Sequence, residues 1–301
     1  MKCSFFSCIL TVACCFSLSN DASAQQPLRW KFEEGQQLTA HLEQQTSSTV
    51  TVANKPVKTA IEMSLDLRWQ VDAVMPAGTK ITQTVERVRV NMQPQGDDSV
   101  EYDSASSKKP VGRAKDMAAA VMPLVGAKFH VVMTDRGEIT AAEPSAELSQ
   151  RLAQDDAATG RGQLYSPESI SRLLRQTLIV LPEKRVEQGH SWSAKNESPG
   201  PLGSFQQEIK YSYVGPTERS SVTVEQFDFT ATFDLASTNS AKPVLHVKQQ
   251  SHTGTVYFDP AAGRTVEAEQ IQRLVTETPY RDSTIVVELE TTLRSTLSPA
   301  P

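Results

Sequence analysis

Cysteine is scarce in this 301-residue chain, and its four cysteines all lie near the start, at Cys3, Cys8, Cys14 and Cys15. Removal of that segment would leave neither disulfides nor thiol nucleophiles. The formal net charge is only -5, with both signs spread along the chain, so the basic face of a nucleic-acid binder is missing. A hydrophobic content of 39% still suffices for a core, which excludes a collagen-like or disordered chain.

Catalytic motifs are also missing, since the sequence has no Gly-x-Ser-x-Gly elbow, P-loop or dinucleotide fingerprint. The glycine-rich Thr159-Gly160-Arg161-Gly162 follows no apolar strand, which favours a linker. The pairs Asp97-Asp98 and Asp155-Asp156 lie in polar loops, where carboxylates stay solvated instead of serving as general acid and base. We therefore expect no catalytic residue and a non-enzymatic protein.

Histidines are few, and their spacing does not suggest a metal site. His246 and His252 share strand parity, but six residues of extended chain separate them by about 20 Å, too far for shared coordination. We expect surface or edge positions for the histidines, and neither a metal nor a cofactor. The five are His41, His130, His190, His246 and His252.

The N-terminus has the order of a secretory signal peptide. Lys2 precedes an apolar run from Phe5 to Leu18, and Ala22-Ser23-Ala24 provides small residues before Gln25. This order predicts cleavage between Ala24 and Gln25, with residues 1–24 as the signal peptide and export to the periplasm or the extracellular space. A buried N-terminal helix is the structural alternative.

A lipid anchor competes with simple cleavage. Thr11-Val12-Ala13-Cys14 resembles a lipobox, in which the cysteine is lipidated and becomes the new N-terminus. Thr11 stands where that motif usually has leucine, and the apolar run continues beyond Cys14. No later run is long enough to span a bilayer, so we expect no transmembrane segment in the mature chain.

Strict alternation of apolar and polar residues predicts a long strand from Ile61 to Ala73 with one buried face. Pro76-Ala77-Gly78 is a turn signal, and a return strand follows. Its apolar residues change from odd to even positions, which predicts a β-bulge near Glu86-Arg87.

A second set of segments repeats this plan. Strand-like alternation through Tyr211 and Tyr213 precedes a predicted turn at Gly215-Pro216, and the return strand switches parity before Phe227. Thr84–Val90 resembles Thr223–Phe229, with the bulge expected at the same step. Two further pairs follow in order: Phe32-Glu33-Glu34-Gly35 with Val186-Glu187-Gln188-Gly189, and Phe129–Gly137 with Val256–Gly263.

These matches predict a divergent internal duplication, although chance similarity between strand-forming segments is the alternative. The expected organisation is a first β-rich repeat over residues 25–143, a helical linker region over 144–180 and a second β-rich repeat over 181–301. Predicted helices are Lys115–Met122, Glu143–Leu152 and Pro167–Leu178, and a last strand runs from Ile285 to Leu293. A polar, turn-rich loop is expected from Pro94 to Arg113. The fold class is mainly β (α+β), with long bulged antiparallel strands and a few covering helices.

Aromatic and apolar residues on the predicted strands allow two interpretations. Trp30, Trp69 and Trp192 could line a hydrophobic pocket, or they could belong to an ordinary core. If Leu67, Trp69, Val88, Phe227 and Phe229 line an open cavity, a lipid or another hydrophobic ligand becomes the expected cargo. If the chain fills that face, loops or strand edges would carry protein contacts. Lys108-Lys109 and Arg113–Lys115 are too small as clusters to indicate an anionic partner, and Asn196-Glu197-Ser198 matches a glycosylation acceptor only weakly.

Several of these features together resemble a family of exported bacterial proteins with no assigned function. They are the signal segment, Phe32-Glu33-Glu34-Gly35, the Ile81–Val90 strand and Phe129–Gly137. Long bulged strands beside few helices are also similar in outline to half-barrel carriers of lipids and lipoproteins in the bacterial envelope. The resemblance implies no catalytic positions. We expect a non-enzymatic binding or scaffold protein, with a hydrophobic-ligand carrier or sensor and a periplasmic hydrolase as alternatives, and an envelope protein or hydrophobic ligand as partner.

Overall fold

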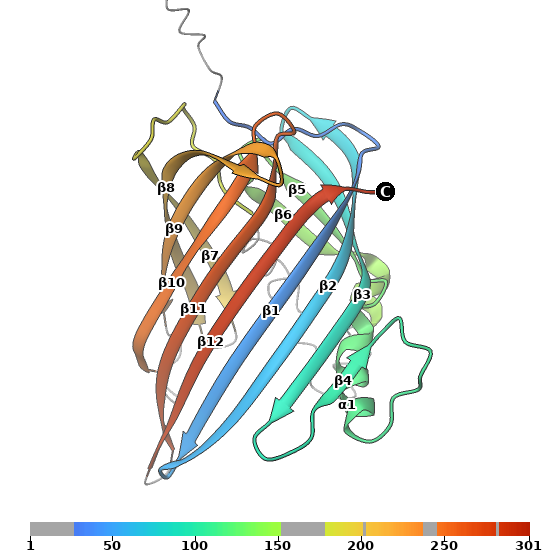
Figure 1. The fold of residues 1–301 in the computed structure, drawn as a ribbon, viewed down its shortest axis with the longest axis vertical. Coiled ribbons are helices and arrows are strands. Elements are labelled where there is room, and N and C mark those ends of the chain that lie inside the picture. The colour runs from blue at the N-terminus through green and yellow to red at the C-terminus, as the bar shows by residue number, and fades with distance from the viewer. Residues whose placement is uncertain (1–26, 152–177, 201–202, 237–245, 281–282) are drawn as a thin grey trace, which may run out of the picture.

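The computed structural model describes residues 27–151, 178–200, 203–236, 246–280 and 283–301. They form one strongly curved antiparallel sheet of 12 strands in the order β6-β5-β3-β2-β1-β12-β11-β10-β9-β8-β7, with β4 paired to β3 outside this path (Figure 1). The mainly β fold expected from the alternation is confirmed. The elements are β1 (Gln37–Val52), β2 (Lys55–Met75), β3 (Gly78–Pro94), β4 (Val100–Asp103), α1 (Arg113–Val121), η1 (Met122–Leu124), β5 (Lys128–Met133), β6 (Ile139–Pro144), β7 (Ser191–Gly200), β8 (Gly203–Arg219), β9 (Val222–Ala236), β10 (His246–Asp259), β11 (Arg264–Tyr280) and β12 (Ser283–Pro299).

Strands β1 and β12 join the two halves of the chain into this single sheet. Their pairing runs without a register shift from Leu38 opposite Pro299 to Val52 opposite Ile285. Sequence alone could not decide whether the halves share a sheet, because neither strand carries a signal for its distant partner. The final strand predicted at Ile285–Leu293 is confirmed within β12.

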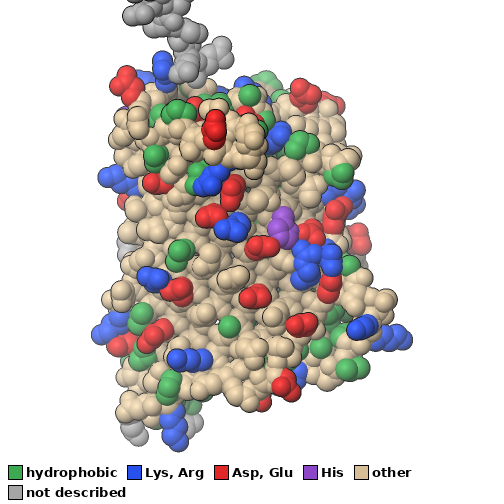
Figure 2. All heavy atoms as spheres, viewed as in Figure 1, with side chains coloured by type: hydrophobic (Ala, Val, Ile, Leu, Met, Phe, Trp, Pro, Cys, Tyr) green, Lys and Arg blue, Asp and Glu red, His purple; other side chains and the backbone are tan. Residues whose placement is uncertain are grey.

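The inner face of the sheet holds the core. In β2 the odd positions Leu65, Leu67 and Trp69 are buried, whereas Asp66 and Arg68 point outward. The same alternation places one apolar face of each long strand inside, where burial of apolar area stabilises the fold. The outer face is polar, and acidic and basic side chains lie interspersed over β1, β2, β11 and β12 (Figure 2).

The bulge predicted in β3 is confirmed. Asp66 pairs with Arg87 and Leu67 pairs with Val85, so Glu86 is the extra residue. The second bulge lies on the other strand of its pair. Tyr213 is opposite Phe227 and Gly215 is opposite Gln226, which makes Val214 of β8 the extra residue.

The predicted turn at Gly215-Pro216 is wrong. Strand β8 continues through both residues to Arg219, and the chain reverses at Ser220-Ser221, which adopt positive φ angles of 49° and 65°. Gly215, with φ 123°, lies beside the bulge. Gly215 and Pro216 therefore accompany a bulge and not a turn, because both residue types also occur at irregular positions within strands.

Three boundaries also differ from the expectations. Helix α1 begins at Arg113, and Pro123 lies within η1 instead of ending the helix. The helix predicted from Glu143 to Leu152 starts later, at residue 146, because residues 143 and 144 form the end of β6. The expected loop from Pro94 to Arg113 contains β4, which pairs with β3.

Two glycine turns in the two halves make the same set of backbone hydrogen bonds. Gly35 N–H donates to the Val71 carbonyl, and Val71 N–H donates to Gln36. Gly189 N–H donates to Tyr213, and Tyr213 N–H donates to His190. The two glycines have φ angles of 81° and 85°, a region open to glycine at little cost. This likeness supports the duplication, which stays a prediction.

Residues 178–181 cross the interior and are held by side chains from both halves. Trp30 Nε1 donates to the Ile179 carbonyl at 3.3 Å, and Trp192 Nε1 donates to the Val180 carbonyl at 2.8 Å. Arg136 Nε donates to the Leu181 carbonyl, and the backbone N–H of Leu181 donates to the Arg136 carbonyl. Trp30 itself precedes β1 and lies outside any strand, which corrects its expected strand position.

Several expectations lie outside the described residues. They are the signal segment with its Ala24-Gln25 cleavage, the alternative anchor at Cys14, Asp155-Asp156, Thr159–Gly162 and most of the predicted helix Pro167–Leu178. Within the described ranges, no helix is long and apolar enough to cross a membrane.

Candidate functional site

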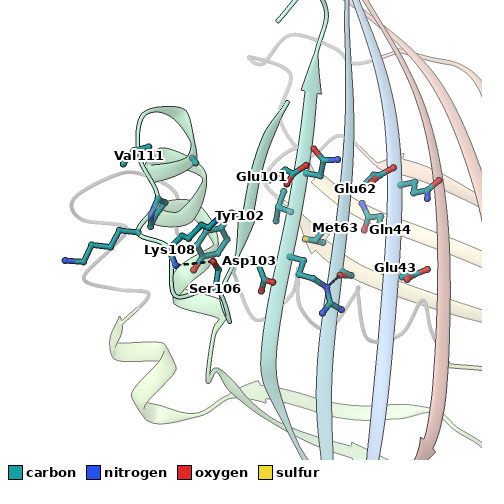
Figure 3. Close-up of a pocket in the computed structure, with 18 residues that line it drawn as sticks. Glu43, Gln44, Glu62, Met63, Glu101, Tyr102, Asp103, Ser106, Lys108 and Val111 are labelled. Atoms are coloured by element: carbon teal, nitrogen blue, oxygen red, sulfur yellow. Dashed lines mark hydrogen bonds between the residues drawn. The ribbon is translucent and has the colours of Figure 1, made fainter. Parts of the chain in front are cut away.

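A groove with a volume of about 720 Å³ lies where β1–β4 meet the loop that leads to α1. Figure 3 shows Glu43, Gln44, Glu62 and Met63 on the strands, with Val111 and Lys108 on the loop and helix side. The groove carries four carboxylates and three basic side chains among its lining residues, next to apolar ones such as Met63, Val90 and Val111. The charged residues are Glu43, Glu62, Glu101, Asp103, Arg89, Lys108 and Lys109.

An ion pair fixes the loop side of the groove. Arg87 donates to Asp103 through Nε at 2.9 Å and through its terminal nitrogen at 2.5 Å, and Ala105 N–H also donates to Asp103. The hydrogen bonds from Arg87 and then from Ala105 lower the pKa of Asp103 to about 2, from an ordinary 3.8. Ser104 continues the ladder, because its N–H donates to Val88 and its Oγ accepts from Val88 N–H. The chain therefore leaves β4 in a fixed direction.

A second charged network borders the strand side. Arg89 donates from Nε to Ser64 at 2.7 Å and from its terminal nitrogen to Asp66 at 3.1 Å. His41 contacts Asp66 at 2.6 Å through Nδ1 and Glu43 at 3.0 Å through Nε2. The pairing of β2 with β1 and β3 brings these residues together. His41 is opposite Asp66, and Ser64 is opposite Glu43 on one side and Arg89 on the other.

The His41 cluster resembles a catalytic dyad in composition but not in geometry. A general base needs a free ring nitrogen within reach of the proton that it removes. Both nitrogens of His41 are already in contact with carboxylates, and the Ser64 hydroxyl accepts from Arg89. Sequence reasoning missed this cluster, because residues about 25 positions apart met only through strand register.

The inner-face residues that sequence singled out as pocket candidates belong to one packed core. Leu67, Trp69, Val88, Phe227 and Phe229 are between 0% and 9% exposed. The cavity beside Leu67 and Trp69 has a volume of about 20 Å³, room for a water molecule at most. In the second half the core is aromatic: Trp192 stacks on Tyr211 with ring centroids 5.3 Å apart, and Phe227 meets Trp192 edge-on.

His252 corrects the expectation that the histidines lie at the surface. It is 5% exposed, its Nε2 is 2.8 Å from Gln270 Oε1, and Phe229 meets its ring edge-on. Burial lowers the pKa of His252, because the charged ring would lose its hydration. His130, His190 and His246 are exposed. No group of three or more potential metal ligands occurs among the described residues.

Residues 77–226 match the model of a family described as a family of unknown function (DUF6263). This region of the chain is similar to that family. The DUF6263 region runs from the turn before β3 into β9, and it contributes the whole loop side of the groove. The sequence resemblance to a family without assigned function is thus confirmed, while the family description carries no activity. No curated protein matches the chain.

Solved structures with some likeness share little sequence with the chain. A protein described as exported, with a YmcC-like fold, from Bacteroides fragilis NCTC 9343 is 9% identical; 90% of this chain and 97% of that chain are covered, with a TM-score of 0.25. An outer membrane channel from Pseudomonas putida F1 is 8% identical, with coverages of 89% and 97% and a TM-score of 0.24. DynF, from the dynemicin biosynthesis pathway of Micromonospora chersina, is 9% identical, with coverages of 92% and 86% and a TM-score of 0.21. TM-scores this low establish neither a common fold nor a common function.

Proposed function

We propose that this is an exported, non-enzymatic binding protein that holds a polar, extended segment of a partner protein in the groove beside β4. The observation that carries the proposal is the contrast between two surfaces. The described core residues of the inner face pack against one another, whereas the groove offers about 720 Å³ whose lining includes seven charged side chains. Export is supported by the order of charge, apolar run and small residues at the N-terminus.

The chemistry of the groove favours a peptide over a lipid. Acidic and basic groups both line it, and hydrocarbon chains gain nothing from contact with charges. Strand β4 pairs with β3 and with no other described strand, so it offers backbone groups to an extended partner. Extended peptides add to such edges through main-chain hydrogen bonds, and neighbouring side chains provide specificity.

A photo-crosslinking amino acid tests the site directly. Val111 lines the groove and is 78% exposed, whereas Val222 is 45% exposed at the β8–β9 hairpin, away from the groove. With the crosslinker at position 111, a discrete protein adduct should form in the native cells. The matched substitution at position 222 should give none, and charge reversal at Glu101 should weaken the adduct at 111.

Other outcomes would contradict the proposal. Equal adducts at both positions would indicate non-specific contact. Lipid that co-purifies with the native protein in native mass spectrometry would favour the hydrophobic-ligand carrier. Turnover of a substrate that disappears in His41→Gln or Asp66→Asn would instead make the protein an enzyme.

A further inference from the structure

A small cavity lies in the core, next to the seam where β1 pairs with β12. It is the cavity of about 20 Å³ beside Trp69, and Ala40 and Leu297, which are opposite each other in that pairing, also line it. Trp69 belongs to β2 in the first half of the chain, whereas Thr265 and Ser295 line the cavity from β11 and β12 in the second half. One water molecule needs on the order of 10 to 15 Å³ of such space, so the cavity has room for one and for nothing larger.

Two residues that line this cavity carry buried polar groups with no hydrogen-bond partner in the described part of the chain. The groups are the indole Nε1 of Trp69 and the hydroxyl of Thr265, and each residue is 4% exposed. In the unfolded chain both groups are hydrogen-bonded to water, so burial without a partner costs free energy. A hydrogen-bonding partner inside the cavity removes that cost.

A bulge in β11 turns Thr265 toward the core. Tyr257 is opposite Glu267, whereas Phe258 is opposite Thr265, and Val266 is therefore the extra residue. The buried positions of β11 are even-numbered at 268 and 270, and beyond the bulge the buried position is 265. Bulges commonly re-aim a side chain in this way. Threonine and valine have the same shape, so the hydroxyl is what distinguishes position 265 from an ordinary apolar core position.

We propose that the cavity binds one structural water molecule, which accepts a hydrogen bond from Trp69 Nε1 and shares a second one with the Thr265 hydroxyl. Ser295, 8% exposed, offers a third polar group in the same wall, and buried waters typically make about three hydrogen bonds. None of the described residues that line the cavity is charged, so an ion would lack a compensating charge there. The water thereby links β2 to β11 and β12 inside the core. This site is separate from the groove and does not depend on the function proposed for it.

Magnetic resonance of the indole N–H protons tests the site directly. In isotopically labelled protein, purified as the cells process it, the Trp69 indole proton should show a nuclear Overhauser cross-peak to water, with the sign that a long-lived bound water gives. Trp30 is the matched control, because it is 3% exposed and its Nε1 donates to the Ile179 carbonyl; it should show no such peak. Absence of the peak at Trp69, or equal peaks at both tryptophans, would overturn the proposal.

The sign of a stability change separates a hydrated hydroxyl from one without a partner. With the water in place, Thr265→Val removes one of its hydrogen bonds, so the midpoint of urea denaturation should fall. Without the water, valine relieves the cost of burying the hydroxyl, so a rise in the midpoint would contradict the proposal. Thr253→Val makes the same exchange at an exposed position of β10 and should change the midpoint little. Circular dichroism confirms that each variant is folded.

Discussion

Gly137 lies against the backbone of Ile179 so closely that a Cβ atom at position 137 would collide with the Ile179 carbonyl oxygen. The same Cβ would lie 2.5 Å from Trp30 Nε1, the atom that donates to that carbonyl. A turn of the first half, the N-terminal segment and the interior segment 178–181 thus meet at one point, where only glycine fits.

Replacement of this glycine should be severely destabilising. Gly137→Ala adds the collision to the strain of φ 92°, and we expect a loss of at least about 3 kcal/mol in the free energy of unfolding. Gly96→Ala is the control, because Gly96 also has a positive φ, 79°, but no atom within 4 Å of the added Cβ; it should lose about 1 to 2 kcal/mol. Urea denaturation measures both, and equal losses would contradict the role of the contact.

The hydrogen bond from Trp30 should be visible against a matched tryptophan. Trp30 and Trp69 are 3% and 4% exposed, but Trp69 Nε1 has no hydrogen-bond partner among the described residues. Trp30→Phe leaves the Ile179 carbonyl without its donor, so it should cost about 1 kcal/mol more than Trp69→Phe. Denaturation of both variants gives the difference, and a larger loss at Trp69 would contradict the expectation.

Burial of His252 predicts a pH dependence of stability near neutrality. Its folded pKa is lowered by desolvation, so below the ordinary value of 6.5 the unfolded chain takes up a proton that the folded chain does not. The resulting contribution is present above 6.5 and is lost as the pH falls from 6.5 toward the folded pKa. His252→Gln should flatten the decline in unfolding free energy between about pH 7.5 and 5.5. The same substitution at the exposed His246 should leave that slope unchanged, and equal slopes in all three proteins would exclude the role of His252.

Asp103 should titrate well below an ordinary aspartate. Its pKa of about 2 stems first from the Arg87 hydrogen bond. The contribution of this bond to the stability of the fold is therefore complete above pH 3.8, the ordinary pKa, and is lost as the pH falls from 3.8 toward 2. Arg87→Gln should move the midpoint of the Asp103 carboxyl chemical shift back toward 3.8. Arg113→Gln, which removes the ion pair to Asp97, should leave that midpoint in place.

The processed N-terminus is predicted to be Gln25. Intact mass of the exported protein should correspond to cleavage after Ala24, and Cys14→Ser should leave that mass unchanged. A diacylated N-terminal Cys14 would replace this prediction with the lipid anchor.

Local pattern predicted the strand β2 and the bulge at Glu86, because both features express themselves in the spacing of apolar residues. The bulge at Val214 was assigned to the wrong strand, since a change of parity in one strand also arises when its neighbour carries the extra residue. Polar β1, with its many Gln, Thr and Ser residues, gave no strand signal of its own.

The candidate sites depended on contacts that local sequence does not contain. Alternation told which residues of β2 share a face, and it predicted the buried run through Leu65, Leu67 and Trp69. Only strand pairing brought His41 to Asp66, and only the path of β4 and its following loop brought Lys108 and Glu101 to the lining of one groove. Burial of His252 was decided by Phe229 and Gln270, which reach it from neighbouring strands. Sequence could predict the faces of a strand because side-chain periodicity is set by the backbone of that one strand. It could not predict the register between strands, because register depends on the packing of all twelve strands of the sheet.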